Sequence, residues 1–141
     1  RISARRSRDL LETGRDASLE RATRLEADGN REAAAARYAD LAERYPKREE
    51  VLVACAWFQE RHDAPEQAER LYARAAGLGR AKSQGVAAYA EFLHRHARLG
   101  EAIALCENHA AKYPEDSTAR LRLADFLLEA GRADAALGHY E

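Results

Sequence analysis

The stretch EEVLVACAWFQERHDAPEQAERLYARAAGLGRAK, residues 49–82, decides the fold, because its pattern returns every 34 residues along the chain. Two alanine series keep that spacing, and their members are Ala22, Ala56, Ala90 and Ala124, then Ala34, Ala68, Ala102 and Ala136. Two registers that hold one period over four copies indicate a tandem repeat, and 34 residues is the length of a helix–turn–helix unit. The sequence therefore predicts an all-α stack of helix hairpins rather than a globular domain with one core.

The repeat divides the chain when Arg15 is counted as position 1. The units are then 15–48, 49–82, 83–116 and a truncated 117–141, and residues 1–14 remain as a leading basic helix or extension. Positions 8 and 20 are alanine in all four units, since two helices cross closely only where side chains are small. Position 24 is Tyr38, Tyr72, Cys106 and Tyr140.

Local signals predict where the helices begin and end. Asp63 has the character of an N-cap, followed by Pro65 in the first turn and Glu66 as a capping-box acid. Asp116 opens the first helix of the last unit, and Gly77, Gly79 and Gly85 predict a flexible joint between units two and three. We expect helices near 16–28, 31–45, 49–61, 65–77, 83–96, 99–113, 117–129 and from 132 onward.

This arrangement of alanines, aromatics and prolines resembles the tetratricopeptide repeat (TPR) family over residues 15–141. Two positions depart from the family pattern. Position 4, often aromatic, is Ser18, Leu52, Val86 and Arg120, and position 15 is Gly29, Asp63, Ala97 and Gly131. The resemblance implies a right-handed superhelical solenoid of stacked antiparallel hairpins, whose concave face is lined by the first helix of each unit. The half-a-TPR family is a weaker match, suggested by Trp57-Phe58 and residues 68–75.

Composition excludes several classes of partner. A net charge of −1 disfavours a general nucleic-acid binder. No stretch approaches the roughly 20 apolar residues of a membrane span, so no membrane partner is expected. The absence of a signal-peptide pattern favours a cytoplasmic location. Because the chain opens at Arg1 and holds no methionine, we expect a trimmed piece, which leaves a periplasmic location open.

No residue set predicts catalysis, a cofactor or a metal. An active site needs a nucleophile, or a paired acid and base, oriented by a third group, and the chain offers no such set. His94 and His96 are two residues apart on one helix, so they point to different faces and cannot share a metal. Cys55 and Cys106 occupy interior positions and are interpreted as buried, small apolar residues. The chain is therefore predicted not to be an enzyme.

The resemblance implies a partner-binding groove at positions 2, 5, 9, 12 and 13 of the first helices. Eleven residues at or beside these positions are expected to contact a partner: Leu19, Val53, Trp57, Arg61, Glu91, His94, Arg95, Leu121, Arg122, Asp125 and Leu128. An apolar centre with walls of mixed charge suits a peptide with hydrophobic anchors, and Trp57 is the residue expected to contribute most. Packing of Trp57 against a neighbouring first helix is the alternative.

The sequence can be compared with the residues that bind one known class of TPR ligand. TPR co-chaperones hold a C-terminal carboxylate with Lys and Asn at positions 5 and 9, Asn at position 6 of the next unit, and Lys and Arg at positions 2 and 6 of the third. From unit one this chain has Leu19, Thr23, Ala54, Gln84 and Ala88, and from unit two Val53, Trp57, Ala88, Thr118 and Arg122. The clamp is absent, so an Hsp70/Hsp90 tail is not the expected ligand.

Three hypotheses about function remain open from the sequence. The first is a non-catalytic, bacterial protein-interaction scaffold that binds a peptide or partner protein in its groove. The second is the regulatory TPR segment of a larger enzyme, and the third is an RNA-processing scaffold of the half-a-TPR kind.

The last unit stops at position 25, soon after Ala136 and Leu137. Ala133, Ala136, Leu137 and Tyr140 are expected to form an apolar stripe that no following helix covers. Further chain or another subunit is therefore expected to cover this end.

Overall fold

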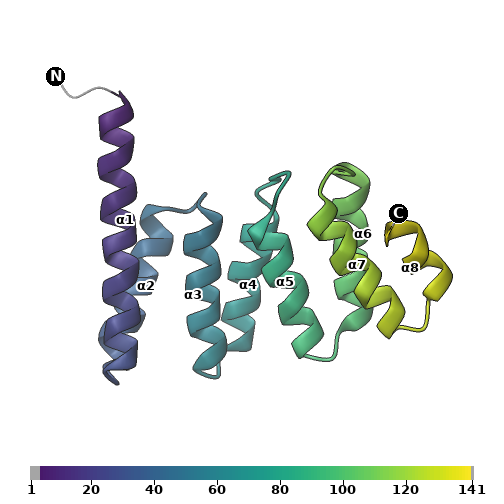
Figure 1. The fold of residues 1–141 in the computed structure, drawn as a ribbon. Helices are drawn as coiled ribbons and strands as arrows, with labels where there is room; N and C mark the ends of the chain where they lie inside the picture. The colour runs from purple at the N-terminus through teal and green to yellow at the C-terminus, as the bar shows by residue number, and fades with distance from the viewer. Residues whose placement is uncertain (1–3, 141) are drawn as a thin grey trace.

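The computed structural model describes the backbone of residues 4–140, and side chains from residue 14 on except those of residues 15, 16, 133 and 140. Over this range the chain forms eight α-helices and no strand. In chain order they are α1 (Ala4–Ala27), α2 (Arg31–Arg44), α3 (Glu49–Arg61), α4 (Pro65–Ala76), α5 (Gln84–Arg95), α6 (Leu99–Lys112), α7 (Ser117–Glu129) and α8 (Ala133–Tyr140). Successive helices pair into hairpins that stack in chain order (Figure 1).

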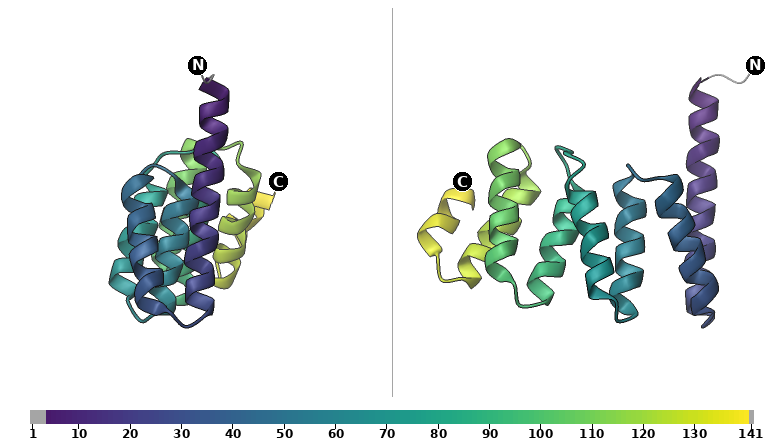
Figure 2. Two further views of the ribbon diagram at one scale, coloured as in Figure 1. Left: turned by 90° about the vertical axis from the view of Figure 1, so that its left-hand side faces the viewer. Right: turned by 180° about the vertical axis from the view of Figure 1, so that it is seen from behind.

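The stack has two sides. The first helices α1, α3, α5 and α7 lie on one side, and α2, α4 and α6 lie on the other (Figures 1 and 2). Each helix packs against the next in the chain, and α3 also contacts α5. Such nearest-neighbour contacts are what a repeat solenoid requires, because each unit buries its apolar face only against the adjacent units.

The two alanine series explain how closely the helices pack. All eight of these alanines have no exposed surface: Ala22, Ala34, Ala56, Ala68, Ala90, Ala102, Ala124 and Ala136. Larger residues fill the space between the units. The Phe58 ring lies 4.7 Å from the Tyr38 ring, and the equivalent Phe92 ring lies 5.2 Å from the Tyr72 ring. The predicted reason for the alanines, close helix crossing, therefore agrees with their burial.

Helix ends follow the prediction within a residue or two except at the start of the chain. The expected separate leader is not seen, since α1 runs without interruption from Ala4 to Ala27. Its N-terminal part projects beyond the rest of the stack (Figures 1 and 2). Gly14 alone does not break the helix, because a single glycine costs only about 1 kcal/mol relative to alanine. The side chains of the arginine cluster Arg1, Arg5, Arg6 and Arg8, and of Leu10 and Leu11, lie outside the described residues.

Position 15 sets the turn inside each hairpin. Its four residues all have a left-handed backbone, with φ of 81° at Gly29, 60° at Asp63, 59° at Ala97 and 78° at Gly131. The prediction that Asp63 caps α4 is therefore wrong. The N-cap is Ala64, which makes no side-chain capping bond, and Asp63 occupies a place where glycine avoids a steric cost.

The glycines between α4 and α5 are held by specific contacts, which differs from the flexible joint that the sequence suggested. A Cβ on Gly85 would lie 2.4 Å from the Ala75 carbonyl carbon, so only glycine fits there. The Tyr113 hydroxyl donates to the Gly79 carbonyl oxygen at 2.7 Å. The Ser83 hydroxyl caps α5 and donates to Glu49 at 2.7 Å.

Both cysteines are buried free thiols, as predicted. The Cys55 thiol donates to the Tyr38 carbonyl oxygen at 3.1 Å. Burial raises the pKa of Cys55 to about 12 and the pKa of Cys106 to about 11. Both residues therefore stay protonated near neutral pH and pack as small apolar side chains.

Candidate partner-binding face

The side of the stack formed by the first helices carries most of the large apolar side chains that remain exposed. Trp57 on α3 is 45% exposed, and Leu121 and Leu128 on α7 are 48% and 47% exposed. Leu19 on α1 and Val53 on α3 are half-buried and pack against the core. The five apolar residues singled out from the sequence thus lie on first helices, with Trp57 near the middle of the series.

Two arginines that the sequence also singled out lie over the Trp57 ring. The Arg61 guanidinium carbon is 4.9 Å from the centre of the indole ring, and the Arg95 guanidinium carbon is 5.2 Å from it. Contacts of this kind contribute roughly 0.5–1 kcal/mol each at exposed sites. The indole ring is therefore held in one orientation while much of its surface stays open.

Each of these arginines also bridges to the preceding unit. Arg61 Nε donates to Glu26 at 2.9 Å, and His62 Nε2 lies 2.8 Å from the same carboxylate. One unit later, Arg95 Nε donates to Glu60 at 3.0 Å, and His96 Nε2 lies 3.2 Å from Glu60. A glutamate at position 12 thus pairs with an arginine at position 13 and a histidine at position 14 of the next unit. This cluster recurs at two successive contacts between units.

The local environment determines the charge of these glutamates. Burial alone would raise the pKa of Glu60, but hydrogen bonds from Arg95, Tyr72 and His96 outweigh it and hold the pKa below its ordinary value. Burial alone would also raise the pKa of Glu26, but hydrogen bonds from Arg61 and His62 outweigh this effect and hold the pKa below its ordinary value. Both carboxylates are therefore ionised near neutral pH and fully engaged within the chain.

At the contact between units three and four, the acidic and basic residues exchange positions. His94 takes position 12 and Glu129 takes position 13, and His94 Nε2 lies 2.8 Å from a Glu129 oxygen. His94 and His96 thus turn to different partners, as their spacing predicted. Neither the ion pairs nor this reversal was recognised from the sequence, although residues 35 apart with opposite charge carried the signal.

Three hollows follow this face, one at each contact between units. The first hollow, about 450 Å³, lies between units one and two and is lined by Thr23, Glu26, Ala27, Tyr38, Ala54, Trp57 and Arg61. The second hollow, about 420 Å³, lies between units two and three and is lined by Glu50, Val53, Ala54, Trp57, Tyr72, Gln84, Ala88, Glu91 and Arg95. Trp57 is a wall of both.

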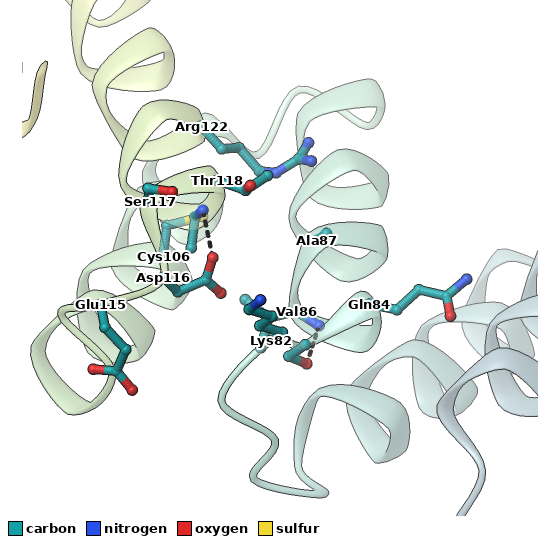
Figure 3. A pocket seen from close by; sticks show the side chains of 12 residues that line it. Lys82, Gln84, Val86, Ala87, Cys106, Glu115, Asp116, Ser117, Thr118 and Arg122 are labelled. Carbon is teal, nitrogen blue, oxygen red and sulfur yellow. Dashed lines mark hydrogen bonds between the residues drawn. The ribbon is translucent and has the colours of Figure 1, made fainter.

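The third hollow, about 400 Å³, lies between units three and four and has a different character (Figure 3). Gln84, Val86 and Ala87 line it from the start of α5, and Thr118 and Arg122 line it from α7 (Figure 3). Its remaining lining is polar except for Ala119 and Cys106, and comprises Lys82, Ser83, Glu115, Asp116 and Ser117. Arg122 forms an ion pair with Glu91 of α5.

Five predicted contact residues line none of the three hollows, namely Leu19, His94, Leu121, Asp125 and Leu128. Asp125 and Leu128 on α7 are exposed. At the end of the stack Ala136 is fully buried, so the expected apolar stripe is not continuous, while Leu137 is 58% exposed. The side chains of Ala133 and Tyr140 lie outside the described residues.

The part of the chain that the structure describes shows neither a metal-binding cluster nor a membrane-spanning helix. No group of three or more His, Cys, Asp or Glu residues is placed there to hold a metal ion. Among the described helices, none is both long and apolar enough to cross a membrane.

Known proteins share this architecture. Residues 93–140 match the tetratricopeptide repeat family model, whereas no curated protein matches the chain at a significant level. Similar solved structures include PilF of Pseudomonas aeruginosa (22% identity, TM-score 0.64, 92% of this chain and 59% of that chain). They also include MamA (16%, 0.59, 84% and 70%) and YrrB, described as a TPR protein with an unusual peptide-binding site (17%, 0.58, 99% and 73%).

Tetratricopeptide repeat sequence is thus identified over residues 93–140. The family model identifies the chain's last repeats, and the fold of the whole is the all-α, right-handed solenoid of TPR structures. The chain spans 59% of the length of the PilF chain that it matches.

Proposed function

We propose that the chain is a non-catalytic scaffold that binds a peptide or partner protein on the face formed by its first helices. The TPR fold serves protein–protein interaction in general, and YrrB, which shares it, is described as having a peptide-binding site. The observation that carries the proposal is Trp57, an indole that is 45% exposed between two hollows.

An exposed indole in this setting favours a binding role over packing alone. Burying apolar surface contributes about 25 cal/mol per Å², so a half-open tryptophan gains free energy when a partner covers it. Tryptophan and arginine are also enriched among the residues that dominate binding energy. Arg61 and Arg95 both lie over the Trp57 ring, which places three such residues together.

The face is also organised before any partner arrives. Glu26 holds Arg61, and Glu60 holds Arg95, so these long side chains have already lost part of their rotamer freedom. Ordering a long side chain at an interface costs about 0.5–1.5 kcal/mol. A partner that binds here avoids much of that cost.

The same pairing disfavours the RNA-scaffold alternative for this face. Binding to phosphates depends on lysines and arginines that can neutralise them. Arg61, Arg95 and Arg122 each contact a glutamate of this chain instead. A protein or peptide ligand is the better match.

The proposal is tested with Trp57→Ala. Peptide ligands are selected from a random display library on the immobilised chain and titrated against both proteins by calorimetry. The expected loss is about 2 kcal/mol of binding free energy, roughly thirtyfold in Kd, as for a central aromatic anchor. Leu137→Ala, an exposed apolar change outside the face, is the control and should leave Kd unchanged. Equal binding by wild type and Trp57→Ala would remove the basis of the proposal.

A further inference from the structure

We infer that the ligand of this face is an extended, uncharged segment with two apolar side chains three residues apart, one entering the first hollow and one the second. The inference rests on the proposed function and specifies its ligand. It follows from how the two hollows are built, how the third differs, and how their charges are paired.

The first two hollows are equivalent sites one repeat apart. In each, a small residue at position 6 lies between a tyrosine at position 24 and an arginine at position 13. These residues are Ala54, Tyr38 and Arg61 in the first hollow, and Ala88, Tyr72 and Arg95 in the second. Trp57 and Ala54 line both hollows. A ligand that fits one hollow with an apolar side chain can therefore fit the other in the same way.

The third contact between units does not repeat this site. Position 6 there is Arg122 instead of alanine, and its side chain reaches back to Glu91. Position 24 is Cys106 instead of tyrosine, and most residues that line the remaining hollow have polar side chains. The run of apolar sites therefore ends after two.

The charges of the first two hollows indicate an uncharged ligand. Four of their five charged residues are paired within the chain: Glu26 with Arg61, Arg95 with Glu60, and Glu91 with Arg122. Glu50, the other charged residue there, is also engaged in an interaction. A charged ligand side chain would have to be desolvated without a free counter-charge, which is costly.

The geometry indicates an extended chain. The two hollows lie on opposite flanks of α3, and packed helices are roughly 8–10 Å apart, so the two sites are separated by about that distance. A polyproline II segment advances about 3.1 Å per residue with three residues per turn. Side chains at i and i+3 therefore lie on one face about 9 Å apart. A helical ligand, about 10–12 Å wide, would rest on the projecting Trp57 ring instead of reaching both alanines.

The test uses blocked twelve-residue peptides on a serine, threonine and proline frame, with leucines at i and i+3. Comparison peptides carry adjacent leucines, a single leucine, or leucines at i and i+7 on a helix-forming frame. Because Trp57 is the only tryptophan of the chain, its fluorescence reports binding at this face directly. The i, i+3 peptide is expected to bind at least tenfold more tightly than each of the others.

Matched variants locate the two leucines. Ala54→Arg and Ala88→Arg place at position 6 the residue that unit four already has. Ala88→Arg should lower the affinity of the i, i+3 peptide to that of the single-leucine peptide, and Ala54→Arg, at a residue that lines both hollows, should lower it at least as far. Ala73→Arg makes the same substitution at an exposed site on α4 and should leave the affinity unchanged. Circular dichroism of each variant establishes that the stack is intact.

The outcomes separate the inference from the proposed function. Equal affinity for all spacings, preference for the helical peptide, or indifference to Ala54→Arg and Ala88→Arg would overturn the inference. In those cases the effect of Trp57→Ala on library-selected ligands still decides the proposed function. If none of the designed peptides binds while selected ligands do, and those ligands lack two apolar residues at i and i+3, the inference is also overturned.

Discussion

The contact between units two and three and the contact between units three and four share a backbone frame but differ in their side chains. The first joins Glu60 to Arg95 and His96, with the Tyr72 hydroxyl donating to the same carboxylate at 2.9 Å. The second joins His94 to Glu129 at the equivalent positions, and it also carries the Arg122–Glu91 pair. What repeats is the set of buried alanines and the left-handed turn. What varies is the chemistry at positions 6, 12, 13 and 24, and that variation determines which contacts leave an apolar hollow.

The two contacts also differ in how deeply their ion pairs lie. The Glu60 side chain is 10% exposed, whereas the Glu129 side chain is 54% exposed. Water screens an exposed pair and competes for its hydrogen bonds, so its contribution is small. We therefore expect units two and three to be coupled more strongly than units three and four.

The largest effect is expected where α4 meets α5, within the more strongly coupled contact. Gly85→Ala would place a methyl group 2.4 Å from the backbone of Ala75, and the two helices would have to separate. Overpacking of this kind costs about 3 kcal/mol or more, measured as the loss in unfolding free energy in urea. Gly100→Ala is the control, because nothing lies within 4 Å of its Cβ position, and it should stabilise α6 by about 0.5–1 kcal/mol. Similar behaviour of the two variants would show that the close packing is not strained.

The second prediction compares the two ion pairs directly. Glu60→Gln should cost about 2 kcal/mol, because it weakens charge-assisted hydrogen bonds from three side chains in a largely buried place. Glu129→Gln should cost about 0.5 kcal/mol or less. Urea unfolding at neutral pH measures both changes. Equal losses would contradict the difference inferred between the contacts.

The smallest effect concerns the turn at position 15, which all units share. Ala97 has φ of 59°, a conformation that costs a residue with a side chain roughly 1–2 kcal/mol. Because glycine in turn loses about 0.5–1 kcal/mol of backbone entropy, Ala97→Gly should raise the unfolding free energy by about 0.5 kcal/mol. Ala104→Gly, in the interior of α6, should lower it by about 1 kcal/mol. A loss of stability in Ala97→Gly would mean that the left-handed turn is not strained.

Much of the fold could be predicted from sequence because the repeat fixes helix number, pairing and the buried alanines at once. The left-handed Asp63 was missed because its own neighbours suggested a cap, whereas alignment with Gly29 and Gly131 gave the better clue. The ion pairs were missed because they join residues 35 apart on different helices, and spacing rules within one helix do not reach that far. The role of Arg122 depends on where its side chain turns, which the sequence alone does not state.

The most direct test of the central claim is to map where a ligand binds. Backbone amide and indole signals of isotopically labelled chain are followed by NMR while a library-selected peptide is added. We predict shifts concentrated at the Trp57 indole and at the amides of Ala54 and Ala88, with the outer helices α2, α4 and α6 unchanged except around Tyr38 and Tyr72, which line the hollows. Shifts confined to the outer helices, with the Trp57 indole signal unmoved at saturation, would contradict the assignment of this face as the partner-binding site.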